Sequence, residues 1–171
     1  QGYNNFTMLQ VAYGMATLAS GGQRHEPRLV KEIVDPVTHD KRPVPTQELP
    51  PLALKPEHVA VIRDAMNGVT IAGTSAKVFA GAGYQSGGKT GTAQAVGARA
   101  NEKYSAARIA EHLRDHSLYE AFAPVDAPRV ALAVIVENAG WGSGAAAPIA
   151  RRVLDYLLLD QYPSRSEEHT S

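Results

Sequence analysis

Apolar residues recur at helical spacing in three stretches of the chain. The first stretch, residues 6–18, predicts core contacts for Phe6, Leu9 and Tyr13, and it ends at a pair of glycines, Gly21 and Gly22, that suit a helix C-terminus. The second stretch covers residues 56–69 and the third covers residues 145–159. Their expected core faces are Val59, Ile62 and Met66 in the second helix, and Ile149, Val153, Tyr156 and Leu157 in the third.

Strand patterns fall between these helices. Short strands are predicted over residues 28–34 and 84–96, and a hairpin over residues 119–125 and 129–137 turns at Asp126-Ala127-Pro128. A polar helix with Ile109 and Leu113 inward is expected over residues 100–117. Residues 36–56 hold six of the eleven prolines, so an extended surface connection is predicted there. This order of elements predicts an α+β fold with a mostly antiparallel sheet.

Charge and composition remove several classes of function. The 171 residues suit one domain, and 17 basic residues balance 17 acidic ones, which argues against a nucleic-acid or membrane-surface binder. The absence of cysteine excludes disulfide scaffolds, thiolate metal sites and cysteine nucleophiles. His112 and His116 have i, i+4 spacing but no third ligand nearby, so we interpret them as a solvated face and predict no metal and no cofactor.

The candidate chemistry lies in residues 86–92, Ser-Gly-Gly-Lys-Thr-Gly-Thr. Residues 83–90 match the G-x-x-x-x-G-K-[ST] pattern of a phosphate-binding loop, but no buried strand precedes them and glycine follows where a helix should begin. Ser86 and Lys89 fit S-x-x-K, a nucleophile motif that requires a helix. Two glycines between Ser86 and Lys89 oppose a helix, so we reject Ser86 as a nucleophile.

The third interpretation is a K-T-G strand. Lys89 would place a cation in a cleft as the catalytic lysine, while the hydroxyls of Thr90 and Thr92 would hold a peptide carboxylate. Gly91 would let an extended peptide lie against the strand. The Thr92 N–H would donate to a developing oxyanion, an interaction worth about 3–4 kcal/mol elsewhere. On these residues alone, a glycine-rich strand with an exposed lysine remains an equal alternative.

Flanking segments add a resemblance. Four segments follow one another along the chain in a recognisable order: Gln1-Gly2-Tyr3, residues 27–30 (Pro-Arg-Leu-Val), Gly73-Thr74 and residues 88–94 (Gly-Lys-Thr-Gly-Thr-Ala-Gln). Together they resemble the transpeptidase domain of class B penicillin-binding proteins, over residues 1 to about 159. Residues 100–104, 109–116 and 121–124 resemble the insertion found in the elongation-specific penicillin-binding protein 2 group.

The resemblance implies a serine D,D-transpeptidase of peptidoglycan and an incomplete penicillin-binding-protein/β-lactamase-like fold. Residues 1–164 would be the C-terminal portion of the domain, with S-x-x-K, S-x-N and a membrane anchor upstream of Gln1. This piece alone is expected to be inactive and poorly folded. Residues 165–171 match the translation of a common sequencing adapter, and we leave them out of the fold prediction.

The same resemblance implies partners and a compartment. Peptidoglycan stem peptides and β-lactams would bind, a SEDS-type glycosyltransferase would be a partner, and the whole protein would face the periplasm from the inner membrane, with no nucleic acid involved. Two alternatives stay open, a nucleotide-binding module built on residues 83–90, and a β-lactam sensor or β-lactamase that shares the K-T-G strand. Trp141, between two glycines, either lines the substrate groove or packs its own loop.

Overall fold

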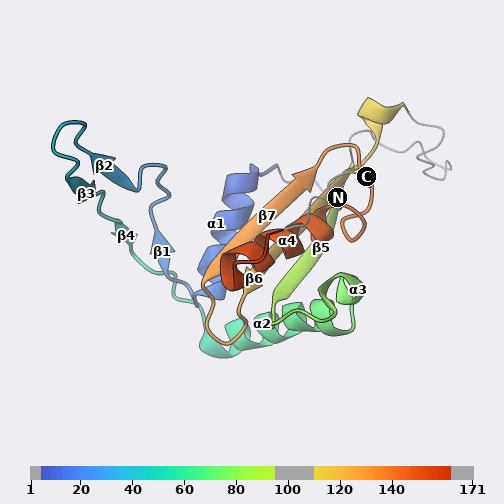
Figure 1. Cartoon of the computed structure of the whole chain (residues 1–171). Helices are drawn as coiled ribbons and strands as arrows, with labels where there is room; N and C mark the ends of the chain where they lie inside the picture. Colours follow the sequence, from blue (N-terminus) through green and yellow to red (C-terminus); the bar gives the residue numbers. More distant parts are fainter. Residues whose placement is uncertain (1–4, 95–109, 163–171) are drawn as a thin grey trace.

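The centre of the molecule is an antiparallel sheet in the order β5–β6–β7, with helices on both of its faces (Figure 1). The computed structural model describes residues 5–94 and 110–162. The strands are β5 (Gly87–Ala93), β6 (His116–Ala123) and β7 (Val130–Val136). The predicted α+β class, the antiparallel sheet and the hairpin of the last two strands are therefore confirmed.

Helix α1 (Met8–Ala19) begins at a capping box. The Thr7 N–H donates to Oε1 of Gln10 (2.9 Å), and the Gln10 N–H donates to Oγ1 of Thr7 (3.2 Å). The predicted helix is confirmed, but its expected core face is wrong, because Phe6 and Leu9 are 66% and 64% exposed. Met15 is buried instead, since α1 lies over β6 and β7 with the neighbouring stripe of side chains inward.

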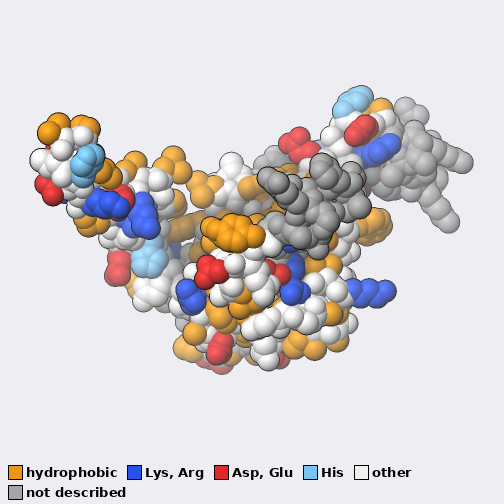
Figure 2. Space-filling model, viewed as in Figure 1, with side chains coloured by type: hydrophobic (Ala, Val, Ile, Leu, Met, Phe, Trp, Pro, Cys, Tyr) orange, Lys and Arg blue, Asp and Glu red, His pale blue; other side chains and the backbone are white. Residues whose placement is uncertain are grey.

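A narrow arm leaves the body after α1 (Figure 1). It consists of two antiparallel ribbons, β1 (Arg24–His25) with β4 (Glu48–Leu49) and β2 (Glu32–Val34) with β3 (Lys41–Pro43). The extended connection predicted over residues 36–56 lies on the surface, and it also contributes the short strands β3 and β4; Pro43 stands at the end of β3, where a strand without a neighbour on that side tolerates it. Hydrophobic and charged side chains share the arm's surface (Figure 2).

Two helices lead from the arm to β5. Helix α2 (Pro56–Ile71) starts with proline at its first position, where no backbone donor is needed, and confirms the predicted helix. Val59 and Met66 are buried as expected, but the inward position predicted for Ile62 is wrong, because its side chain is exposed. The short α3 (Ala76–Phe79) follows within the predicted loop-rich segment.

The expected helix over residues 100–117 is wrong in its described part. Residues 110–117 form a 3-10 turn, η2 (Glu111–Leu113), and then enter β6; residues 100–109 lie outside the described residues. His112 and His116 therefore do not share a helix face, and the Nδ1 of His116 accepts the Asn138 N–H (3.0 Å).

Helix α4 (Ala146–Leu159) confirms the third predicted helix but not its core face. Its buried residues are Ala146, Ala147, Ala150 and Leu154, which pack with Tyr119 and Phe79 on one face of the sheet. The larger residues Ile149, Val153, Tyr156 and Leu157 are exposed. On the opposite face Met15, Ala19, Met66 and Phe122 form a second cluster. None of the helices in residues 5–94 and 110–162 is long and apolar enough to cross a membrane.

Candidate active site

Strand β5 is an edge strand, because within residues 5–94 and 110–162 it pairs with β6 alone. Side chains alternate along a strand, so Lys89 and Gly91 face α1, whereas Gly88, Thr90 and Thr92 face α4. Lys89 is exposed, and its ammonium donates to the carbonyl oxygen of Thr90 (2.7 Å). Thr90, Gly91 and Thr92 are partly exposed along the same strand. The structure thus brings together the residues that the sequence singled out.

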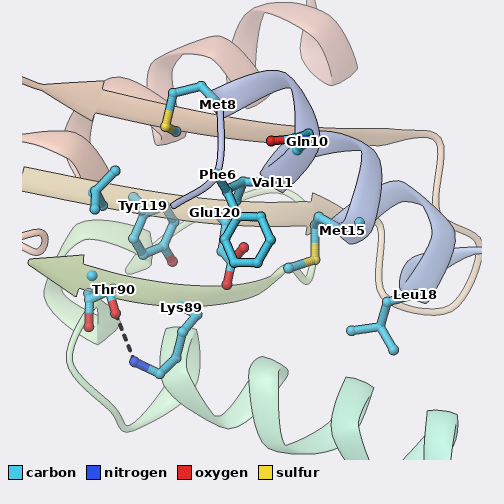
Figure 3. A pocket seen from close by; sticks show the side chains of 13 residues that line it. Phe6, Met8, Gln10, Val11, Met15, Leu18, Lys89, Thr90, Tyr119 and Glu120 are labelled. Carbon is cyan, nitrogen blue, oxygen red and sulfur yellow. Dashed lines mark hydrogen bonds between the residues drawn. The ribbon is translucent and has the colours of Figure 1, made fainter. Parts of the chain in front are cut away.

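A cavity of about 570 Å³ lies between α1 and the strands β5 and β6, which carry Lys89 and Glu120 (Figure 3). It forms because α1 packs mainly over β6 and β7, whereas β5 is contacted chiefly by α2. One side is lined by residues before and on α1, among them Phe6, Met8, Val11, Met15 and Leu18, and the other by residues of β5 and β6: Lys89, Thr90, Gly91, Leu118, Tyr119 and Glu120. The cavity therefore combines an apolar wall with two opposite charges, a composition typical of a ligand site.

Glu120 stands directly across the ladder from Lys89, so both side chains are on the α1 face. Burial raises the pKa of the Glu120 carboxyl above its usual range, and the nearby charge of Lys89 opposes that rise. Sequence reasoning missed this residue. A lone acid inside an apolar strand was the available signal, but its alignment with Lys89 follows only from the β5–β6 register.

The other face of β5 is held by hydroxyl contacts. The hydroxyls of Thr90 and Thr74 are 3.2 Å apart, which connects β5 to the turn between α2 and α3. In the same turn the Ser75 hydroxyl bonds the Tyr119 hydroxyl (2.8 Å), and both residues are fully buried. Burial raises the pKa of Tyr119 to about 12, so the phenol remains protonated at neutral pH. These contacts hold the turn and β5 at a fixed spacing.

The loop before α4 supports β5 from the same face. A Cβ on Gly142 would lie 2.6 Å from the carbonyl oxygen of Gly91, so the two backbones touch. The Ser117 hydroxyl donates to the carbonyl oxygen of Trp141 (2.9 Å) and accepts the Ala146 N–H (3.0 Å). Trp141 contributes its backbone to this packing, while its side chain is 76% exposed.

The geometry disfavours the two competing motifs. The residues after Lys89 continue as strand to Ala93, so no helix N-terminus faces a phosphate site at residues 83–90. Ser86 is 2% exposed and directly precedes the strand. In an extended chain, residues three apart lie about 10 Å from each other and their side chains point to opposite faces. Ser86 and Lys89 therefore do not have the arrangement of S-x-x-K, in which one helical turn places serine and lysine side by side. Among the described residues no three acidic or histidine side chains gather as metal ligands.

Comparisons with known proteins agree with this geometry. A family model described as penicillin binding protein transpeptidase domain matches residues 1–155. Peptidoglycan D,D-transpeptidase MrdA of Haemophilus influenzae is 41% identical over 167 residues, which cover 95% of this chain and 25% of that protein. MrdA of Escherichia coli K12 is 38% identical over 164 residues, again 25% of its length. The chain therefore spans about a quarter of the curated relatives it matches.

Solved structures give the same relationship. Pseudomonas aeruginosa PBP2 in complex with WCK 5153 aligns with a TM-score of 0.72 and 32% identity, over 100% of this chain and 33% of that one. Penicillin-binding protein A from Mycobacterium tuberculosis, as its imipenem acyl-enzyme complex, aligns with a TM-score of 0.70 and 31% identity, over 92% of this chain and 32% of that one.

Proposed function

The chain belongs to the penicillin-binding protein transpeptidase family, and on that premise we propose that it forms the C-terminal portion of a peptidoglycan D,D-transpeptidase. The whole protein would crosslink D-Ala-D-Ala stem peptides and would be acylated by β-lactams. The observation that carries the proposal is the position of residues 89–92, Lys-Thr-Gly-Thr, on an exposed sheet edge that borders a cavity.

The reaction transfers an acyl group through a serine ester. A serine hydroxyl, in an S-x-x-K segment that we place upstream of Gln1, attacks the penultimate D-Ala carbonyl. Its proton goes to a neighbouring base, and the carbonyl becomes a tetrahedral oxyanion. The base then returns the proton to the peptide nitrogen as the C–N bond breaks, so the terminal D-Ala leaves as an amine and the acyl-serine ester remains. An amine from a neighbouring stem peptide then attacks the ester, forms the crosslink amide and restores the serine hydroxyl.

This chain supplies the strand side of that site. The Lys89 ammonium would stabilise negative charge in the cleft, and the Thr90 hydroxyl would donate a hydrogen bond to the substrate carboxylate. Gly91 leaves the strand edge bare, so an extended peptide can pair with it. The Thr92 N–H would donate to the oxyanion, and its hydroxyl would add to the carboxylate contacts.

The outward face of α4 supports the view that more of the domain lies elsewhere in the protein. Ile149, Val153, Tyr156 and Leu157 present a continuous apolar stripe, which a further helix of the same domain would cover. We also propose that an upstream anchor holds the protein on the periplasmic face of the inner membrane, and that a SEDS-type glycosyltransferase is its partner. Fractionation and copurification of the tagged full-length protein test these two statements.

The central experiment labels the full-length protein with a fluorescent penicillin. Covalent labelling of the wild type is expected, with labelling lost in Lys89→Ala but retained in Lys77→Ala, an exposed lysine on α3. Thermal melting of both variants checks the fold. Wild-type labelling rates in Lys89→Ala would refute the role of Lys89. Release of the label within seconds would indicate a β-lactamase, and ATP binding without labelling would indicate the nucleotide module.

A further inference from the structure

An acidic side chain lies directly across the sheet ladder from the lysine of the proposed catalytic strand. Glu120 and Lys89 are opposed in the β5–β6 ladder, both on the α1 face, and both line the 570 Å³ cavity. Directly opposed side chains in an antiparallel pair have Cβ atoms about 5 Å apart. Any anion that approaches Lys89 from the cavity therefore also experiences the charge of Glu120.

Apart from Lys89 and Glu120, the described residues that line the cavity carry no charged side chain. Residues before and on α1 contribute side chains that do not titrate: Phe6, Met8, Gln10, Val11, Met15 and Leu18. On β6, Leu118 is apolar, and the Tyr119 side chain faces the other side of the sheet, where it bonds Ser75. On β7, the residue opposite Glu120 is Ala133. Lys89 is thus the one cationic side chain among the described residues that line the cavity.

Resting on the function proposed above, we infer that Glu120 is a specificity-determining residue that weakens the attraction of the Lys89 strand for anionic ligands. A Lys–Glu pair presents a dipole rather than a full positive charge to a ligand carboxylate. The two side chains need not form a contact ion pair for this effect, because the Coulomb energy falls only as the inverse of distance. Substrate carboxylates would then be bound chiefly through Thr90 and Thr92, whose hydroxyls recognise geometry as well as charge.

The partial burial of Glu120 adds a pH dependence. Its carboxyl has a raised pKa, so it is neutralised at a higher pH than an ordinary glutamate. Acidification through that pKa removes the negative charge, and affinity for an anionic ligand should rise toward that of a variant without the charge.

The test compares Glu120→Gln with wild type in the full-length protein. Two N-acyl-D-alanyl thioesters serve as probes, one whose thiol leaving group carries a free carboxylate and the methyl ester of the same compound. We expect Glu120→Gln to raise kcat/KM for the acid about 3- to 10-fold, mainly through KM, and to change the ester less than 2-fold. The advantage of the variant should shrink in high salt and as the pH falls through the raised pKa of Glu120.

Glu57→Gln is the matched control, because it removes one negative charge from the exposed first turn of α2, away from the cavity lining. No change in KM for the acid, a fall in kcat/KM for the acid, or equal changes for acid and ester would each overturn the inference. Thermal melting identifies a Glu120→Gln protein that has lost its fold, and Glu120→Thr, a smaller uncharged residue, then repeats the comparison. Failure of the wild type to react with either thioester or with labelled penicillin would instead refute the proposed function.

Discussion

Gly88→Ala tests whether the spacing between β5 and β6 is set by the tyrosine beneath it. The backbone of Gly88 does not adopt positive φ, so alanine fits its conformation and should stabilise the strand by about 0.4–1 kcal/mol through the unfolded state. The new Cβ, however, would lie 2.0 Å from the Tyr119 hydroxyl oxygen and 2.6 Å from Cζ. One of the two groups must therefore move.

Tyr119 cannot move cheaply. It is 1% exposed, its ring stacks on Phe79 at 5.9 Å, and its hydroxyl bonds Ser75 at 2.8 Å. Overpacking of this kind costs about 1–3 kcal/mol, and loss of the hydroxyl bond costs about another 1 kcal/mol. These costs exceed the intrinsic gain, so we expect Gly88→Ala to destabilise the domain by about 2 kcal/mol.

Denaturant unfolding of the full-length protein measures the change, with Gly14→Ala as control, since a Cβ at Gly14 meets no atom within 4 Å. The double variant with Tyr119→Leu removes the colliding hydroxyl and ring tip. In that background Gly88→Ala should cost less than 0.5 kcal/mol, giving a coupling of about 2 kcal/mol. An equal cost in both backgrounds would show that Tyr119 does not set the spacing and would refute the reasoning.

Three further expectations follow from individual contacts. Thr90→Val should lower kcat/KM for a carboxylate-bearing thioester by roughly 10- to 100-fold, the value of a hydrogen bond to a charged group, and equal loss for the methyl ester would contradict this. Arg151→Met removes two bonds to Asp155 within α4 (2.7 and 2.8 Å) and the bond to the Val78 carbonyl (3.0 Å) that joins α4 to α3, and should cost about 1.5–3 kcal/mol in thermal unfolding; an unchanged melting temperature would count against it. Two backbone N–H groups hold the pKa of Asp35 below its ordinary value of 3.8, so the β2–β3 turn gains stability above that pH and loses it as the pH falls through the lowered pKa. NMR titration of the turn should show that loss, and Asp35→Ala should abolish it.

The sequence predicted the order and type of the main elements because their periodicity is local. All three long helices and the terminal hairpin are where the patterns place them. It did not predict which helix face is buried. In α4 the rule that the largest apolar side chains point inward fails, because Tyr119 and Phe79 already fill the space above the sheet. Ala146, Ala147 and Ala150 let the helix approach them closely, and the larger residues remain outside.

The candidate site was partly predictable for a similar reason. Residues 89–92 are contiguous, so a motif reveals them, and their strand follows from composition. Glu120 and Thr74 reach Lys89 and Thr90 only through tertiary structure. About 30 residues separate Lys89 from Glu120, and no local rule gives the register of strands joined by so long a connection. A pairing shifted by one residue would turn Glu120 toward α4 and away from Lys89.

The glycines of β5 illustrate how packing and chemistry share one sequence pattern. Gly88 completes the phosphate-binding-loop pattern of residues 83–90, yet all three glycines of β5 are required by their neighbours. A Cβ on Gly87 would lie 2.4 Å from the ring of Phe122, and one on Gly88 would meet Tyr119. Gly91 is confined from both faces, by Leu118 on one side and by the Gly142 backbone on the other. Two of the three glycines thus serve the packing of β6, and only Gly91 also leaves the strand edge open to a peptide. Substitution of Gly87 should therefore impair stability and acylation together, whereas substitution of Gly91 should impair acylation more than stability.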